Sequence, residues 1–201
     1  MTRGISIPPY RPLASIARGR LPAVPSRMSF AEQAAQLAEI GRQCYARGWA
    51  LGTSGNFSAV VNRDPLRLAI TTSGVDKGGL SVGEIVEIDE QGQVVVGSGR
   101  PSAETGLHLA IARVRGAGAV LHTHSIWSTI LSDAATGDGL ALEGYEMLKG
   151  LEGVGTHEHR EWLPILDNTQ DWAAAVPQVE AILTGHQIGR ASCRERVSPR
   201  V

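Results

Sequence analysis

Two histidines separated by one residue, His122 and His124, form the part of the sequence best suited to bind a metal ion. The apolar run 118–123 predicts a buried strand, and side chains two positions apart on a strand point to the same face. Both imidazoles could therefore reach one ion, and two nitrogen ligands favour zinc over calcium or magnesium. A hydrogen-bonded histidine pair at the end of a strand accounts equally well for this spacing.

A carboxylate, Glu104, lies in the first turn of the helix predicted over residues 103–115. The helix dipole favours a negative charge at that end, so helix capping by itself accounts for an acidic residue. His108 follows four positions later on the same face, where the two side chains could form a metal pair. A packed, hydrogen-bonded histidine is the alternative for His108.

Two loops of small residues could bind an anion through backbone N–H groups and hydroxyls. Their sequences are Thr53-Ser54-Gly55-Asn56 and Thr71-Thr72-Ser73-Gly74, and Lys77 adds a cation just after the second loop. Neither loop matches the glycine patterns of nucleotide-binding folds. Each loop alone could equally be an ordinary turn.

The elements that must position these residues alternate between strands and helices. Strands are predicted over residues 59–62, 67–72, 85–89, 93–96, 118–123 and 161–165, and helices over 30–47, 103–115, 127–131 and 172–183. Hairpin connections between several strands predict an α/β fold with a mainly antiparallel central sheet covered by helices, not a regular doubly wound fold.

Local signals support the helix boundaries. Ser29 with Glu32, and Ser81 with Glu84, have the spacing of capping boxes. Gly116 predicts the end of the helix that begins near Glu104, whereas a proline, Pro177, falls inside the last predicted helix and should kink it.

The composition is that of one globular domain, with 201 residues, 42% hydrophobic and 19% charged. No apolar run is long enough for a membrane span. The two cysteines, Cys44 and Cys193, exclude a disulfide framework and a paired-thiolate zinc site. The chain has a net charge of −1, of which residues 28–186 carry −9, and an acidic body argues against a nucleic-acid partner.

The two ends differ from this acidic body. Residues 1–27 contain five arginines, five prolines and no acid, so we expect a disordered or mis-annotated extension, with a transit peptide as the alternative. Residues 187–201 resemble a translated sequencing adapter, so we expect a non-native tail. The domain would then be residues 28–186, with its C-terminal part missing.

Taken together, the motifs resemble the class II aldolase superfamily of zinc-dependent sugar-phosphate enzymes. The resemblance rests on Gly52–Ser58, Ser73-Gly74 with Lys77-Gly78, Pro101–Thr105 and Ala119–Ser125. Within the superfamily, the run Leu142–Gly150, together with Thr156-His157-Glu158 and Leu163-Pro164-Ile165 with Asp167-Asn168, is similar to the methylthioribulose-1-phosphate dehydratases of methionine salvage.

The resemblance implies a three-layer fold and a cytoplasmic lyase with one Zn²⁺ per subunit, held by His122 and His124. Glu104 would be the general acid and base, with a pKa raised by apolar surroundings. The substrate would be a sugar phosphate, and the assembly a homotetramer. The phosphate-binding positions that the resemblance implies are Gly55, Asn56, Ser73, Gly74, Lys77 and Ser102.

Members of the family carry a third zinc histidine in a late Gly-His-Gly segment that follows a strand and precedes a tryptophan. Here Gly185-His186-Gln187 follows a helix, so we expect that ligand to be missing, with His157 and His159 as less suitable substitutes. The alternatives in function are a sugar-phosphate aldolase or epimerase on the same scaffold, and a non-catalytic adducin-like binding domain. Glu104, His122 and His124 argue against the last.

Overall fold

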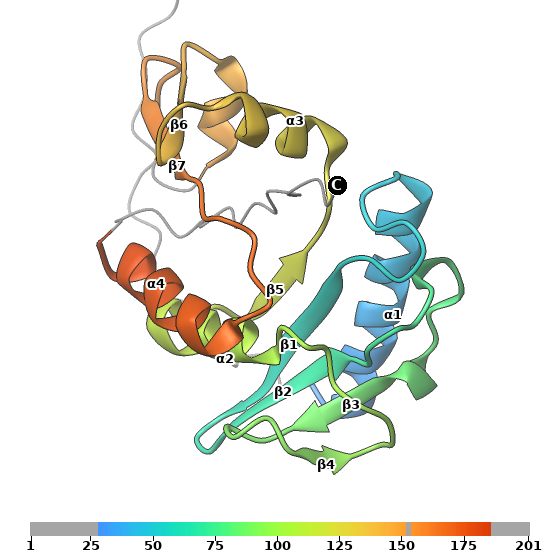
Figure 1. The fold of residues 1–201 in the computed structure, drawn as a ribbon. Coiled ribbons are helices and arrows are strands. Elements are labelled where there is room, and N and C mark those ends of the chain that lie inside the picture. The colour runs from blue at the N-terminus through green and yellow to red at the C-terminus, as the bar shows by residue number, and fades with distance from the viewer. Residues whose placement is uncertain (1–27, 152–153, 186–201) are drawn as a thin grey trace, which may run out of the picture.

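A computed structural model describes residues 28–151 and 154–185. The expected disordered or mis-annotated extension 1–27, the expected non-native tail 187–201, and His186 lie outside the described residues. Figure 1 shows a twisted sheet with helices on both faces and a smaller two-stranded sheet beyond its edge. The predicted α/β class and the antiparallel central sheet are confirmed.

The central sheet has the strand order β4-β3-β2-β1-β5 and is antiparallel throughout. Its strands are β1 (Asn56–Arg63), β2 (Leu66–Thr71), β3 (Ile85–Ile88), β4 (Val94–Val96) and β5 (Ala119–His122). The predicted hairpin of β3 and β4 is present. The short pair β6 (Gly139–Glu143) and β7 (Arg160–Pro164) forms a separate sheet, and β6 is a strand that the sequence analysis missed.

Helix α1 (Phe30–Ala46) covers one face of the central sheet. The predicted capping box is formed: the Ser29 hydroxyl accepts from the N–H of Glu32, whose carboxylate accepts from the N–H of Ser29. Leu37 of the helix packs in one core cluster with Phe57 of β1.

Helix α2 (Thr105–Arg115) covers the opposite face, and α4 (Trp172–Gly185) lies against α2 (Figure 1). Leu109 of α2 packs on Leu68 and Ile70 of β2 in a second core cluster. Alternate strand residues thus serve two helical layers, because successive side chains of a strand point to opposite faces. The expected helix–sheet–helix arrangement is confirmed.

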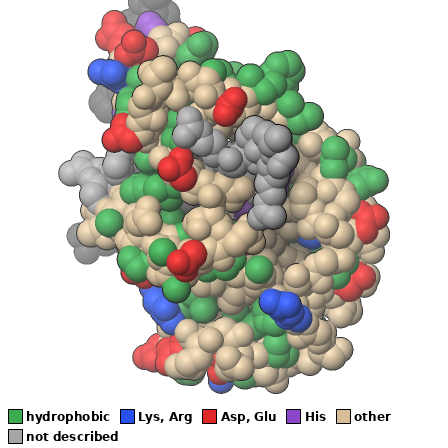
Figure 2. Space-filling view, viewed as in Figure 1, with side chains coloured by type: hydrophobic (Ala, Val, Ile, Leu, Met, Phe, Trp, Pro, Cys, Tyr) green, Lys and Arg blue, Asp and Glu red, His purple; other side chains and the backbone are tan. Residues whose placement is uncertain are grey.

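Strand β5 is at the edge of the sheet and is not buried, contrary to the prediction. It pairs with β1 alone among the described residues, and Leu121 in its middle is 49% exposed. Helix α3 (Ile126–Ala134) follows and also carries exposed apolar side chains, which Figure 2 shows over this part of the surface. An apolar run thus indicated a strand correctly but gave no information about what covers it.

Candidate functional site

All nine site residues expected from the sequence line one cavity of about 190 Å³. They come from the start of β1 and the loop before it, from the loop after β2 and the 3₁₀ helix that follows it, from the segment before α2, and from the end of β5 and the turn just beyond it. The nine residues are Gly55, Asn56, Ser73, Gly74, Lys77, Ser102, Glu104, His122 and His124. The fold therefore assembles into one site motifs that are separated by up to about seventy positions in the sequence.

The two histidines lie side by side, although only one is in a strand. His122 is the last residue of β5, and His124 lies just beyond it, where its N–H donates to the carbonyl of Trp49 at 2.7 Å. The ring centroids are 4.8 Å apart and the ring planes are inclined by 25°. The two rings are therefore stacked next to each other at the edge of the cavity.

The loop before β1 brings its backbone close to the end of β5. Asn56 pairs with His122 in the sheet, and Gly55 has φ +72°, a conformation that favours glycine. A Cβ at position 55 would lie 2.6 Å from the carbonyl oxygen of His122. Glycine is thus needed here both for its backbone conformation and for its small size.

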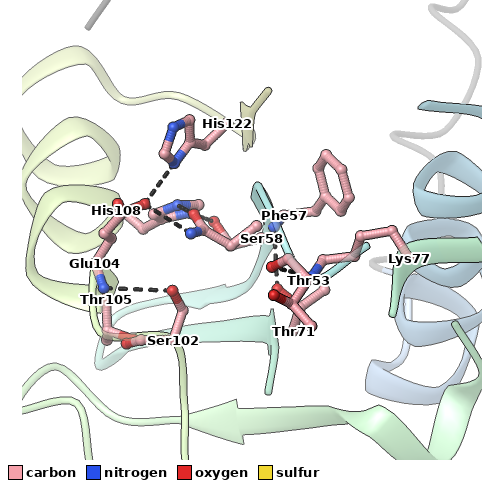
Figure 3. Close-up of polar contacts among 11 residues, drawn as sticks. Thr53, Phe57, Ser58, Thr71, Lys77, Ser102, Glu104, Thr105, His108 and His122 are labelled. Carbon is pink, nitrogen blue, oxygen red and sulfur yellow. Dashed lines mark hydrogen bonds and ion pairs between the residues drawn. The ribbon is translucent and has the colours of Figure 1, made fainter. Parts of the chain in front are cut away.

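The second loop is joined to the segment that carries Ser102. The N–H of Ser73 donates to the carbonyl of Arg100 at 2.8 Å, and the N–H of Ser102 donates to Thr71 at 3.3 Å. The hydroxyl of Ser102 accepts from the N–H of Glu104 at 3.3 Å, as Figure 3 shows. These bonds hold the small-residue loop and the carboxylate on one wall of the cavity.

Lys77 has a different environment from that of a solvent-exposed cation. Its side chain is 1% exposed, and Nζ donates to the carbonyls of Thr53 at 3.2 Å and Val75 at 2.9 Å. Burial lowers the pKa of Lys77, although the nearby Asp76 and Glu84 act in the opposite direction. The ammonium group therefore ties the first loop to the end of the second.

Glu104 is the N-cap residue of α2, not a member of its first turn, and its side chain makes no capping bond. The carboxylate instead turns toward the sheet, where Oε2 accepts from Asn56 Nδ2 at 2.7 Å and from His122 Nδ1. Figure 3 shows the contact between Glu104 and His122. Burial acts to raise the pKa of Glu104, but the bonds and charge of His122 and the bond from Asn56 outweigh it. The pKa is therefore lowered, and the expectation of a raised value is wrong.

His108 has the packed, hydrogen-bonded environment that was the alternative to a metal pair. Its ring is 1% exposed, with Nδ1 at 2.7 Å from Ser58 Oγ and Nε2 at 2.5 Å from Asn56 Oδ1. Burial lowers the pKa of His108 to about 4. Spacing within α2 could not reveal these partners, because both lie on β1.

The imidazoles of His122 and His124 are cavity side chains of the kind that zinc prefers as ligands. The carboxylate of Glu104 accepts from Nδ1 of His122, which leaves Nε2 of that ring for a metal, an arrangement typical of histidine ligands. In residues 28–151 and 154–185, no group of three His, Cys, Asp or Glu side chains could hold a metal. His157 and His159 instead contact Glu146 and Glu161.

Other residues of the cavity were not anticipated. Gln170 and Trp172, which precede and begin α4, complete its lining. Trp172, Glu104 and His122 also border a second, larger cavity of about 560 Å³ next to α4. Only the packing of α4 on α2 brings this late segment to the site.

No helix in the described part of the chain has the length and apolar character needed to cross a membrane.

Comparisons with known proteins agree with this geometry. Residues 35–188 match the family described as class II aldolase and adducin N-terminal domain. The chain is 43% identical over 168 residues to the methylthioribulose-1-phosphate dehydratase of Acidiphilium cryptum, covering 79% of each protein. It is also 43% identical over 159 residues to the dehydratase of that name from Marinobacter nauticus, covering 78% of this chain and 76% of the relative.

Solved structures share the fold. An L-fuculose 1-phosphate aldolase has a TM-score of 0.64 at 23% identity, covering 80% of this chain and 71% of that protein. The L-fuculose-1-phosphate aldolase of Thermus thermophilus has a TM-score of 0.59 at 24% identity, covering 82% of this chain and 75% of that protein.

Proposed function

The chain belongs to the class II aldolase and adducin N-terminal domain family, and we propose that it dehydrates 5-methylthioribulose 1-phosphate in methionine salvage. The product is 2,3-diketo-5-methylthiopentyl 1-phosphate. Curated relatives named methylthioribulose-1-phosphate dehydratase support this substrate. The observation that carries the proposal is the cavity in which the small-residue loops, Glu104 and the two histidines meet.

The phosphate end of the substrate binds to the small-residue loops. The hydroxyls of Ser73 and Ser102 line this part of the cavity, and Gly55 and Gly74 leave room there for a phosphate group. Asn56 lies beside them, with its side-chain amide bonded to His108 and Glu104. Lys77 stabilises this subsite, because its ammonium group donates to backbone carbonyls beside both loops. Anchoring one end of a short substrate fixes the position of its reacting carbons.

His122 and His124 would hold one zinc ion per subunit. A zinc ion there would supply a Lewis acid that polarises the ketone at C2 and makes the proton on C3 more acidic. The Nδ1 atom of His122 donates to Glu104, which keeps the ring in one tautomer and one orientation.

Glu104 moves the protons of the reaction. Its lowered pKa keeps it ionised at neutral pH, so it can accept the C3 proton. The same proton is then delivered to the hydroxyl leaving C4, which departs as water, and the resulting enol becomes the 3-ketone. Both hydrogen bonds of the carboxylate in the described part of the chain use Oε2, which leaves Oε1 for proton transfer.

The test compares two substrates and a matched pair of variants of the full chain supplied with zinc. We expect formation of the diketone from methylthioribulose phosphate, and no cleavage of fuculose 1-phosphate. Glu104→Gln should abolish turnover, whereas Glu90→Gln, an exposed turn residue, should leave it unchanged. His122→Ala should abolish both turnover and zinc binding. Cleavage of fuculose 1-phosphate would favour the aldolase alternative, and turnover that survives His122→Ala would refute the metal mechanism.

The proposal includes a cytoplasmic homo-oligomer. Helix α3 and the 3₁₀ helix Glu146–Gly150 expose apolar side chains that a partner subunit would cover. Trp127 is 76% exposed and Met147 is 90% exposed. Sedimentation of the chain at several concentrations tests this point. A monomer at all concentrations would refute it.

A further inference from the structure

The buried ring of His108 has no role in the reaction proposed above, yet it is two hydrogen bonds from the reacting carboxylate. A row of contacts runs from Ser58 to His108, from His108 to Asn56, from Asn56 to Glu104, and from Glu104 to His122. Figure 3 shows Ser58, His108, Glu104 and His122 close together. Ser58 and Asn56 lie on β1, and His108 lies on α2. The row therefore crosses from the sheet to the helix and back.

The partners of His108 determine which ring nitrogen carries the hydrogen. Asn56 Oδ1, at 2.5 Å from Nε2, can only accept, so Nε2 must carry a hydrogen. Burial lowers the pKa of His108 to about 4, so the ring is neutral at pH 7 and Nδ1 carries no hydrogen. Nδ1 therefore accepts from the hydroxyl of Ser58 at 2.7 Å.

The Glu104 carboxylate can only accept, so it independently requires the Nδ2 group of Asn56 on its side, and this orientation agrees with the tautomer of His108. With Oδ1 facing the Nε2–H of His108, the Nδ2 group faces Glu104 and donates to Oε2 at 2.7 Å. A flipped amide would set an NH₂ group against an N–H and a carbonyl oxygen against a carboxylate. Both contacts of the flipped form are repulsive, and the contact between His108 and Asn56 is buried, where such a mismatch is costly.

We propose that His108 is a positioning residue that fixes the Asn56 amide as a donor, so that Glu104 is held through Oε2 and keeps Oε1 for the substrate. The inference rests on the proposed role of Glu104 in proton transfer. His108 itself touches neither the substrate nor the metal in this scheme. Its contribution is the single Nε2–H bond to Asn56.

Two variants separate this bond from the mere filling of space. His108→Gln places an amide NH₂ near the position of Nε2 and can still donate to Asn56. His108→Asn is also polar and uncharged, but its side chain is shorter, so it reaches only toward Ser58. Both variants are tested in the full chain with zinc added.

The first readout is NMR of the labelled chain, which does not depend on activity. We expect His108 to carry hydrogen on Nε2 alone at pH 7. The side-chain NH₂ resonances of Asn56 should stay protected from exchange in His108→Gln and lose that protection in His108→Asn. A hydrogen on Nδ1 in the unmodified protein, or equal protection of Asn56 in the two variants, would overturn the inference.

The second readout is the rate of dehydration. We expect His108→Gln to keep kcat close to the original value and His108→Asn to lower it about 10–100-fold, as is typical when a supporting hydrogen bond is lost. KM should change less than kcat, because the other phosphate-binding positions, Gly55, Ser73, Gly74 and Ser102, are unaltered. Equal kcat values in the two variants would refute the positioning role. If the unmodified chain does not turn over this substrate, the proposed function fails, and the NMR readout still decides whether His108 orients Asn56.

Discussion

Acidification should destabilise the fold through His108. Burial lowers the pKa of this histidine from 6.5 to about 4 in the folded chain, and the charged groups that act on it are His122, which also lowers the pKa, and Glu104, which raises it. Between pH 6.5 and 4 the unfolded chain therefore binds more protons at this site than the folded chain does. Folding stability contributed by neutral His108 is complete above pH 6.5 and is lost as the pH falls toward 4.

The size of the effect follows from the shift. A change of about 2.5 pKa units at about 1.36 kcal/mol per unit corresponds to about 3 kcal/mol. For a urea dependence of about 2 kcal/mol per molar, the unfolding midpoint should fall by about 1.5 M between pH 7 and pH 4.

The assay is urea unfolding at a series of pH values, followed by tryptophan fluorescence, for the unmodified chain and for His108→Gln. Glutamine does not titrate, so the difference between the two curves isolates His108 from the carboxyl groups that also titrate in acid. The unfolding free energy of the unmodified chain, relative to that of His108→Gln, should decrease steadily as the pH falls from 7 to 4. If the two stability curves run parallel from pH 7 to pH 4, the buried neutral histidine inferred from the structure is wrong.

Three further predictions concern local features of the fold. In thermal unfolding, Gly55→Ala should cost about 1–2 kcal/mol for its left-handed backbone, and about 1–3 kcal/mol more because the Cβ would lie 2.6 Å from the carbonyl oxygen of His122. The control Gly52→Ala, at φ +56° with no atom within 4 Å of the added Cβ, should show only the backbone cost. Equal losses in the two variants would contradict this reasoning. Lys77→Met should lower the unfolding free energy by about 1–3 kcal/mol, because two backbone carbonyls lose their ammonium donor. The same variant should bind inorganic phosphate more weakly in calorimetry. Unchanged stability would argue against a role of Lys77 in connecting the two loops. Ser29→Ala should cost about 1 kcal/mol in chemical unfolding through the lost capping bond at α1, whereas Ser29→Asp should retain most of the stability, and equal losses in both variants would refute the capping role.

Features that depend on neighbouring residues were predictable from the sequence. The capping box of Ser29 and Glu32 formed as expected, because its two partners are only three positions apart in the sequence and the start of the helix itself brings them into contact. Gly116 ends α2 in the left-handed conformation that glycine favours. The nine residues expected at the site line one cavity, and the resemblance to a known family gave weight to their motifs, which are ambiguous one at a time.

The sequence by itself determined where the helices and most strands lie and which side chains could do chemistry, because backbone preference and residue type are local properties. Tertiary structure alone decided how those side chains behave. It buried Lys77 between two carbonyls, turned Glu104 away from its helix end to His122, and joined His108 to Asn56. Each outcome depends on contacts between segments distant in the chain, and a pKa or a hydrogen-bond partner is set by such contacts rather than by sequence neighbours.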